Sequence, residues 1–245
     1  MHFTNIEIMK DLFGRAILDY QLQPSPLYLV TETSISEEDR MEVAYLFRDF
    51  DAMPAMEQKA LQLATGNVLD VGCGAGSHSL YLQNERKLNV TSVDISKNAI
   101  EACQLRGLRN AIVQNVIEMQ PEQPFDTILL LMNGAGMCGR IKNLLPFLLK
   151  LKSMLADGGQ ILLDSSDISY MFDKEDDGGV WIPANVDYYG EVQFKIAYKG
   201  KKEKPFDWLY VDFETLKKAA SLASLSCELI VEGPHFDYLA KLQKF

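Results

Sequence analysis

The pattern of apolar and polar positions changes at Gly66. From there on, short apolar runs alternate with amphipathic stretches, which predicts strands that alternate with helices and form a parallel sheet. The strands predicted in this region are 67–71, 89–94, 111–114, 126–132 and 160–164. The helices predicted beside them are 76–85, 96–106 and 141–156. The pattern therefore predicts an α/β fold.

The residues before Gly66 follow a different pattern, one that predicts helices. Apolar side chains recur at helical spacing within 5–20, and a second helical region is predicted at 36–50. Pro54 is expected to open a third helix, because proline is favoured at a helix start. The predicted division of the chain is an N-terminal helical cap, 1–65, and an α/β domain, 66–245.

The residues after Asp164 interrupt the alternation of strands and helices. A polar stretch at 172–187 is predicted to be a long loop. Two strand-like runs around a lysine-rich turn predict an antiparallel β-hairpin inserted at 188–212. This hairpin is expected to act as a lid over the active-site face, and a dimer contact is the alternative. The elements predicted to complete the fold are a helix at 213–224 and strands at 227–232 and 235–243.

The most informative stretch is 68–82, in which a strand, a glycine turn and a helix start follow one another. Gly72, Gly74 and Gly76 remove every second Cβ atom from the turn. The backbone can then take conformations that are closed to other residues, and a ligand can lie directly on the main chain. A turn of this kind favours a nucleotide-type ligand.

Two features separate this turn from that of dinucleotide-binding proteins. Their fingerprint is Gly-x-Gly-x-x-Gly, whereas the third glycine here, Gly76, comes one position early and Ser77 has its place. Asp70 stands two residues before the first glycine, where its charge would repel a pyrophosphate and suits a ligand that carries a cation. Asp94 ends the next strand, where a carboxylate can accept hydrogen bonds from both hydroxyls of a ribose.

The run from Asp70 to Gly76, Asp-x-Gly-x-Gly-x-Gly, resembles motif I of class I S-adenosylmethionine-dependent methyltransferases, and Val93-Asp-Ile-Ser resembles their second motif. The resemblance implies a Rossmann-like, doubly wound, mostly parallel seven-stranded sheet with an antiparallel last strand. It also implies S-adenosyl-L-methionine as the cofactor. The residues that the resemblance assigns to cofactor binding are Asp70, Gly72, Cys73, Gly74, Gly76, Asp94, Ile95, Asn115, Val116 and Met132.

The remaining candidates concern the acceptor and catalysis. Asn133 and Arg140 follow the fourth strand and, with Arg48 from the N-terminal region, are predicted to line the substrate pocket. Arg48 could instead reach the cofactor carboxylate or form a surface salt bridge. His78 is the one candidate for a general base, and a polar residue in the first turn of a helix is the favoured alternative. Asn115 is equally well explained as a turn residue.

Charge and the loop after the fourth strand bear on the acceptor. A net charge of −10 argues against a nucleic-acid partner. The sequence Met132-Asn-Gly-Ala135 has neither the prolines nor the aromatic residue of enzymes that methylate exocyclic amines of nucleic-acid bases. We therefore expect in-line transfer of a methyl group to a small molecule. The alternatives are a non-catalytic, cofactor-binding regulatory or partner protein, and another adenosyl-cofactor transferase on the same fold.

The cysteines, at positions 73, 103, 138 and 227, form neither a C-x-x-C pair nor a metal-ligand spacing. They indicate reduced thiols, predict no metal site and favour a cytoplasmic protein. The first residues show no signal-peptide pattern, and the most apolar stretch, 144–155, is interrupted by Lys150 and Lys152, so no membrane contact is expected. The attacking atom, the need for a base and the oligomeric state stay open.

Overall fold

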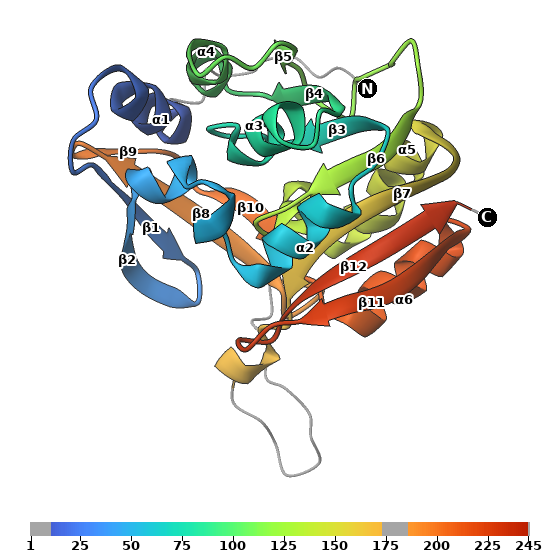
Figure 1. The fold of residues 1–245 in the computed structure, drawn as a ribbon. Helices are drawn as coiled ribbons and strands as arrows, with labels where there is room; N and C mark the ends of the chain where they lie inside the picture. Colours follow the sequence, from blue (N-terminus) through green and yellow to red (C-terminus); the bar gives the residue numbers. More distant parts are fainter. Residues whose placement is uncertain (1–10, 173–185, 245) are drawn as a thin grey trace.

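The structure, a computed structural model, describes residues 11–172 and 186–244. Its centre is a seven-stranded sheet in the order β11-β12-β7-β6-β3-β4-β5 (Figure 1). The strands of this sheet are β3 Asn67–Val71, β4 Asn89–Asp94, β5 Ala111–Val113, β6 Phe125–Leu130, β7 Leu155–Ser166, β11 Leu225–Glu232 and β12 Asp237–Lys244. Neighbouring strands from β5 to β7 pair in parallel, and β12 is antiparallel to both β7 and β11. The predicted α/β, Rossmann-like sheet with its antiparallel last strand is confirmed.

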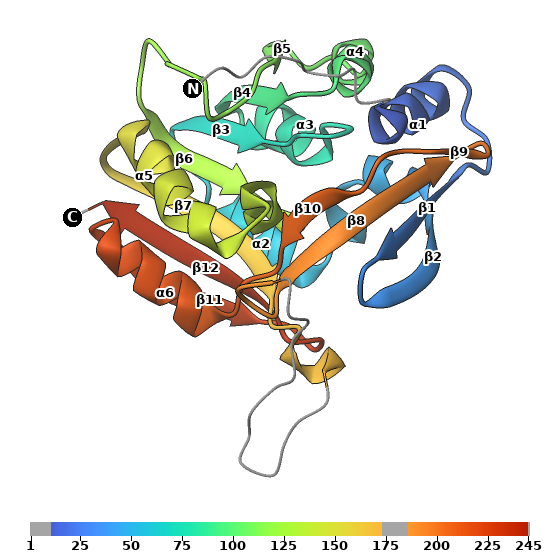
Figure 2. The same cartoon turned by 180° about the vertical axis from the view of Figure 1, so that it is seen from behind.

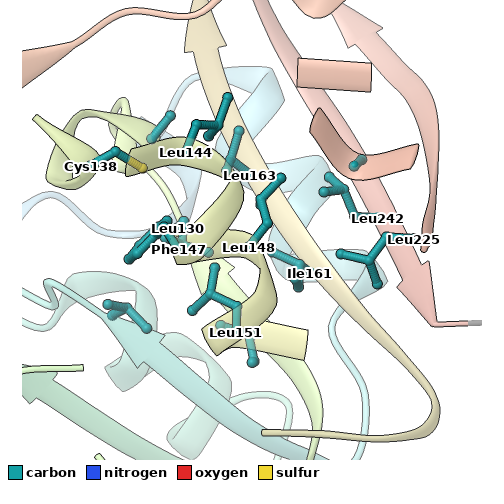
Figure 3. Packing of buried hydrophobic residues seen from close by; sticks show 14 of the residues in the cluster. Leu130, Cys138, Leu144, Phe147, Leu148, Leu151, Ile161, Leu163, Leu225 and Leu242 are labelled. Carbon is teal, nitrogen blue, oxygen red and sulfur yellow. The ribbon is translucent and has the colours of Figure 1, made fainter. Parts of the chain in front are cut away.

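Helices pack on both faces of this sheet, because successive side chains of a buried strand point to opposite faces. The helices are α2 Ala55–Leu63, α3 Ser77–Asn84, α4 Lys97–Leu105, α5 Leu144–Ser153 and α6 Phe213–Leu222. Along β6, Leu129 belongs to the same apolar cluster as Met56 of α2. Its neighbours Ile128 and Leu130 belong to the cluster that contains Leu148 of α5, which Figure 3 shows from close by. β6 therefore contributes to two cores.

The helix predicted at 141–156 is wrong at both ends. A short 3₁₀ helix, η4 Ile141–Asn143, precedes α5. Pro146 lies in the first turn of α5, where a missing backbone N–H leaves no intrahelical bond unmade. At the other end β7 starts at Leu155, which pairs with Phe125 before the register shifts. The predicted strand 160–164 is thus the regular middle of a longer strand.

A second, antiparallel sheet stands beside the first, with the strand order β10-β8-β1-β2 and β9 paired to β8. Its strands are β1 Tyr28–Thr33, β2 Ser36–Glu42, β8 Glu191–Tyr198, β9 Lys201–Lys202 and β10 Phe206–Leu209. The helix predicted at 36–50 is therefore wrong: a strand occupies its first half, and two 3₁₀ helices, η1 Val43–Phe47 and η2 Phe50–Ala52, follow. β2 buries none of its residues fully, so its sequence has no apolar alternation that could have revealed it.

The predicted hairpin at 188–212 is present as the antiparallel pair β8 and β10. On its other side, β8 pairs with β1, a strand from the N-terminal part of the chain. In Figures 1 and 2 the second sheet lies on the side to which β6 points, which is the carboxyl edge of the parallel strands. This placement agrees with the expected lid, although the choice between a lid and a dimer contact stays a prediction. Most of the predicted loop 172–187 lies outside the described residues.

The helix predicted at 5–20 is present as α1, Leu12–Leu22, and the first residues of the predicted range lie outside the described part. Asp11 caps α1 by accepting a hydrogen bond from Gly14 N at 3.1 Å. Pro54 immediately precedes α2, as predicted. The division of the chain after residue 65 stays a prediction. Within 11–172 and 186–244, no helix has the length and apolar character needed to cross a membrane.

Candidate cofactor and acceptor site

The glycine turn joins β3 to α3 at the point where strand order reverses between β4 and β6. Gly72, Gly74 and Gly76 have φ angles of 70°, 53° and 80°, in the left-handed region that favours glycine. The amides of Gly72 and Cys73 donate to Val93 O at 2.8 and 3.1 Å, which fixes the turn against β4. In an open parallel sheet this carboxyl edge at the reversal point is where ligands bind.

Asp94 is locked against this turn. Its Oδ2 accepts a hydrogen bond from Gly74 N at 3.0 Å, and its Oδ1 accepts one from Ser96 N at 2.9 Å. Burial raises the pKa of Asp94, and the two backbone bonds oppose that rise. Ile95 beside it is 65% exposed, which leaves its face open to a ligand. Ser96 caps α4 by accepting from Ala99 N, as its position predicts.

Asp70 lies beneath the turn and is only 2% exposed. Its Oδ2 accepts a hydrogen bond from Ser79 Oγ at 2.6 Å, and Ser92 Oγ donates in turn to Ser79 Oγ at 2.7 Å. Burial raises the pKa of Asp70, and the charge of His78 opposes that rise. The described contacts of this carboxyl therefore tie the first turn of α3 to β3 and β4.

Arg48, Glu57 and His78 form a buried ionic cluster next to α3. Arg48 Nη2 lies 2.5 Å from both carboxylate oxygens of Glu57, and His78 Nε2 lies 2.6 Å from Glu57 Oε2. The three residues are 9%, 5% and 9% exposed, respectively. Arg48 also donates to Tyr45 O at 2.6 Å, and its guanidinium lies over the Tyr45 ring. Its Nε is buried without a hydrogen-bond partner among the described residues, which leaves one donor for a ligand.

The surface salt bridge considered for Arg48 is therefore wrong, because the pair is buried. No motif or spacing in the sequence singles out Glu57. Glu57 lies in the first turn of α2, where an acidic residue is ordinary and stabilises the helix dipole. Only the tertiary fold brings its carboxylate to the arginine and the histidine.

We expect Glu57→Gln to lower the free energy of unfolding by about 3–5 kcal/mol, because it leaves the buried Arg48 charge without its partner. Burial raises the pKa of Glu57, but the hydrogen bond and charge of His78 and the charge of Arg48 outweigh it and hold that pKa below 4.5. The carboxylate's contribution to stability is thus fully present above pH 4.5 and is lost as the pH falls through the lowered pKa. Urea unfolding at pH 7 measures the effect.

The control for this variant is Glu228→Gln. Glu228 pairs with Lys241 at 2.9 Å but is 62% exposed, so its pair contributes little. Equal effects of the two substitutions would contradict the role of burial at Glu57.

The loop after β6 carries two consecutive non-glycine residues in the left-handed region. Met132 and Asn133 both have φ of 60°, and Met132 is 40% exposed. Their amides donate to Asp164, at 3.0 Å to Oδ2 and 2.6 Å to Oδ1. Asn133 Oδ1 accepts from Ser165 Oγ at 2.9 Å. The loop is thereby tied to the end of β7.

Two residues that the sequence analysis did not single out lie over the glycines. A Cβ atom at Gly72 would lie 3.3 Å from Met137 Sδ, and one at Gly74 would lie 3.9 Å from Ile17 Cδ1. Met137 belongs to the 3₁₀ helix η3 Gly134–Cys138, and Ile17 belongs to α1. Helical spacing identifies Ile17 as a core residue, but nothing local to it points to the turn.

The other predicted site residues have plain structural surroundings. Asn115 is exposed and its Oδ1 accepts from Ile117 N at 3.0 Å, which is the contact of a turn residue; Val116 is 6% exposed. Cys73 Sγ lies 3.9 Å from Cys103 Sγ. Arg140 binds Asp207 through Nε at 2.8 Å and Nη2 at 3.1 Å, so its guanidinium is already engaged. Within the described parts of the chain, no cluster of His, Cys, Asp and Glu could hold a metal ion.

Comparisons with known proteins identify the family. Residues 43–208 match the family described as a methyltransferase domain. The crystal structure of an S-adenosylmethionine-dependent methyltransferase from Bacteroides fragilis, in complex with S-adenosyl-L-homocysteine, is 42% identical and covers 96% of both chains with a TM-score of 0.87. DesVI from Streptomyces venezuelae is 16% identical with a TM-score of 0.56, over 78% of this chain and 91% of its own, and shows the fold alone.

Curated relatives match a shorter stretch. A tRNA U34 carboxymethyltransferase from Glaesserella parasuis is 31% identical over 107 residues, which are 40% of this chain and 32% of the relative. A probable (S)-tetrahydroprotoberberine N-methyltransferase 2 from Papaver bracteatum is 30% identical over 106 residues, 40% of this chain and 28% of the relative. The chain thus spans about a third of the length of these relatives. The family match covers more than half of the chain, which therefore belongs to the methyltransferase-domain family and is an S-adenosyl-L-methionine-dependent methyltransferase.

Proposed function

We propose that the enzyme transfers the methyl group of S-adenosyl-L-methionine to a small molecule, which binds between the carboxyl edge of the parallel sheet and the second sheet. The observation that supports this most strongly is the cover that β10 provides over the loop after β6. A Cβ atom at Gly136 would lie 2.0 Å from the Trp208 ring, so the two surfaces are in close contact. This contact closes the site on the side of β10, and an enclosed site admits a small acceptor more readily than a folded macromolecule.

The residues at the edge fit S-adenosyl-L-methionine. Asp94 would accept hydrogen bonds from the ribose hydroxyls, and Ile95 would pack against the adenine, for which its exposed side chain is free. The buried, unpartnered Nε of Arg48 would meet the carboxylate. Asp70 would act on the ammonium group through water. The further residues that we place around the cofactor are Gly72, Cys73, Gly74, Gly76, Asn115, Val116 and Met132.

Methyl transfer from S-adenosyl-L-methionine needs little acid–base catalysis from the protein. The cofactor supplies a methyl group on a sulfonium, and the thioether that leaves is neutral, so no general acid is needed. The chain's own residues then contribute by aligning the acceptor and excluding water. A base is needed only for an acceptor that arrives protonated. His78 is the candidate, although its Nε2 is engaged by Glu57.

A direct test is incubation of the purified protein with methyl-labelled S-adenosyl-L-methionine and fractionated cell extract. We expect label in the small-molecule fraction, and we expect Asp94→Ala to abolish it. Label in RNA or protein would overturn the small-molecule acceptor. Absence of label from every fraction, with cofactor binding intact by calorimetry, would favour a non-catalytic regulatory or partner protein.

An RNA acceptor is the second candidate, because several curated relatives are tRNA U34 carboxymethyltransferases. Against it stands the net charge of −10, since binding to RNA relies on neutralising phosphates with lysine and arginine. The site itself adds carboxylates, from Asp70, Asp94, Glu57 and Asp164. The same labelling experiment separates the two acceptor classes.

A further inference from the structure

Asp164 is a buried carboxylate that the proposed chemistry does not use. It lies near the carboxyl end of β7 and is 9% exposed. Both of its oxygens accept backbone hydrogen bonds, from Met132 N at 3.0 Å and from Asn133 N at 2.6 Å. A carboxylate with one amide on each oxygen fixes the direction of the peptide planes that it binds.

The loop that Asp164 holds would not take this conformation unaided. Met132 and Asn133 both lie in the left-handed region, with φ of 60°. A single non-glycine residue there is uncommon, and two in a row persist only when the surroundings over-determine them. The hydrogen bonds to the Asp164 carboxylate therefore stabilise the strained backbone of these two residues.

A second set of bonds extends the hold to the neighbouring sheet. Asn133 Oδ1 accepts from Ser165 Oγ at 2.9 Å, and Ser165 Oγ accepts from Val211 N at 3.0 Å. Asn133 Nδ2 donates to Leu209 O at 3.4 Å, at the end of β10. The loop after β6 is thus fixed between β7 and β10, and η3, which follows it, carries Met137 over Gly72.

The charge of Asp164 lowers the stability of the folded protein. Burial and the nearby charge of Glu57 raise the pKa of Asp164 to about 7, against the hydrogen bonds from the loop. A carboxyl with a raised pKa is more stable protonated, so holding it ionised above pH 7 lowers the stability of the protein. A group placed only for stability would not need this charge.

We propose that Asp164 is a positioning residue, which holds Met132 and Asn133 in the left-handed conformation that the cofactor and acceptor require. This inference rests on the proposed site. It makes Asp164 act through the loop, without touching either ligand itself.

The test is Asp164→Asn, which keeps the size of the side chain but turns an amide N–H₂ towards one of the two backbone donors. The matched control is Asp126→Asn. Asp126 also accepts a backbone bond, from Asn67 N at 2.7 Å, but at the amino end of β6, far along the sheet from the site. Calorimetry measures the affinity for S-adenosyl-L-homocysteine, and hydrogen exchange follows the amides of Met132 and Asn133.

We expect Asp164→Asn to weaken S-adenosyl-L-homocysteine at least fivefold at pH 8 and to speed exchange at both amides at least tenfold. Its midpoint in urea should stay close to that of the wild type, because the substitution also removes a buried charge. Asp126→Asn should leave affinity and exchange unchanged. This split between binding and stability is what a purely structural role would not produce.

Wild-type affinity and exchange in Asp164→Asn would overturn the proposal, as would an equal loss in Asp126→Asn. If Asp164→Asn does not fold, Asp164→Glu decides: its longer carboxylate should displace the loop and weaken binding, and wild-type affinity would overturn the proposal. If the wild type itself does not bind S-adenosyl-L-homocysteine, the proposed cofactor site fails. The exchange rates then still show whether Asp164 holds the loop.

Discussion

Asp94→Ala is expected to weaken S-adenosyl-L-homocysteine binding at least about a hundredfold. The carboxylate stands at the end of β4, and both of its oxygens are oriented by backbone donors, Gly74 N and Ser96 N. Each hydrogen bond from a ribose hydroxyl to a charged acceptor contributes about 1.5–3 kcal/mol, and every 1.4 kcal/mol changes affinity about tenfold. Calorimetry on the wild type and the variant gives the ratio directly.

The control for this prediction is Asp126→Ala at the opposite edge of the sheet, which also removes an acceptor of a backbone N–H. We expect it to leave the affinity unchanged. Asp94→Asn is informative as well, because it keeps one oxygen and should bind with intermediate affinity. An affinity of Asp94→Ala within a factor of three of the wild type would remove Asp94 from the ribose role.

The central strands and the glycine turn can be predicted from the sequence, because the patterns that specify them lie within short stretches of the chain. The strand at 67–71 and the strand at 89–94 have the predicted bounds, since each is a short apolar run between turn residues. The turn between β3 and α3 is equally local: three glycines with positive φ stand where the spacing places them. Asp94 follows from the same logic, as the residue at the end of a strand.

Apart from its hairpin of β8 and β10, the second sheet could not be predicted, because its remaining pairing joins parts of the chain that are far apart. β1 pairs with β8, with Thr31 opposite Ile196, although strands β3 to β7 of the first sheet lie between them in the sequence. β2 is nearly all polar, and its charged residues read as the solvent face of a helix. β2 is a strand because it forms hydrogen bonds to the edge of β1, and no residue of β2 indicates this pairing in the sequence.

The candidate site also combines features that local sequence patterns predict with contacts that only the tertiary fold creates. Arg48 and His78 stood out by residue type, but their environment depends on Glu57, which only the packing of α2 against α3 brings near. Asp164 lies near the carboxyl end of a strand, as Asp70 and Asp94 do, but it is outside the motifs, so the sequence assigns it no role. Arg140 is predicted to line the substrate pocket, and the fold pairs its guanidinium with Asp207 on β10. Residue type predicts which groups are reactive, and tertiary contacts decide which stay free.

Gly76→Ala is expected to lower the free energy of unfolding by about 2–4 kcal/mol, because two separate costs add at this position. The residue has φ of 80°, and a Cβ atom there would lie 2.6 Å from Leu108 Cδ1 and 2.9 Å from Cys103 Sγ. Both neighbours are buried, at 6% and 0% exposure, so neither can move aside without repacking. Urea unfolding of the variant measures the sum.

Gly107→Ala separates the two costs. Gly107 has φ of 91° with no heavy atom within 4 Å of its would-be Cβ, so this variant meets the backbone strain alone, about 1 kcal/mol. The difference between the two variants is the steric part at Gly76, and Leu108→Ala should remove much of it in a double-mutant cycle. Equal losses in Gly76→Ala and Gly107→Ala would show that the turn needs glycine at position 76 for its conformation only. A larger loss at Gly76 means that Cys103 of α4 and Leu108 close so tightly on the turn that the motif's third glycine is required by packing as well as by φ.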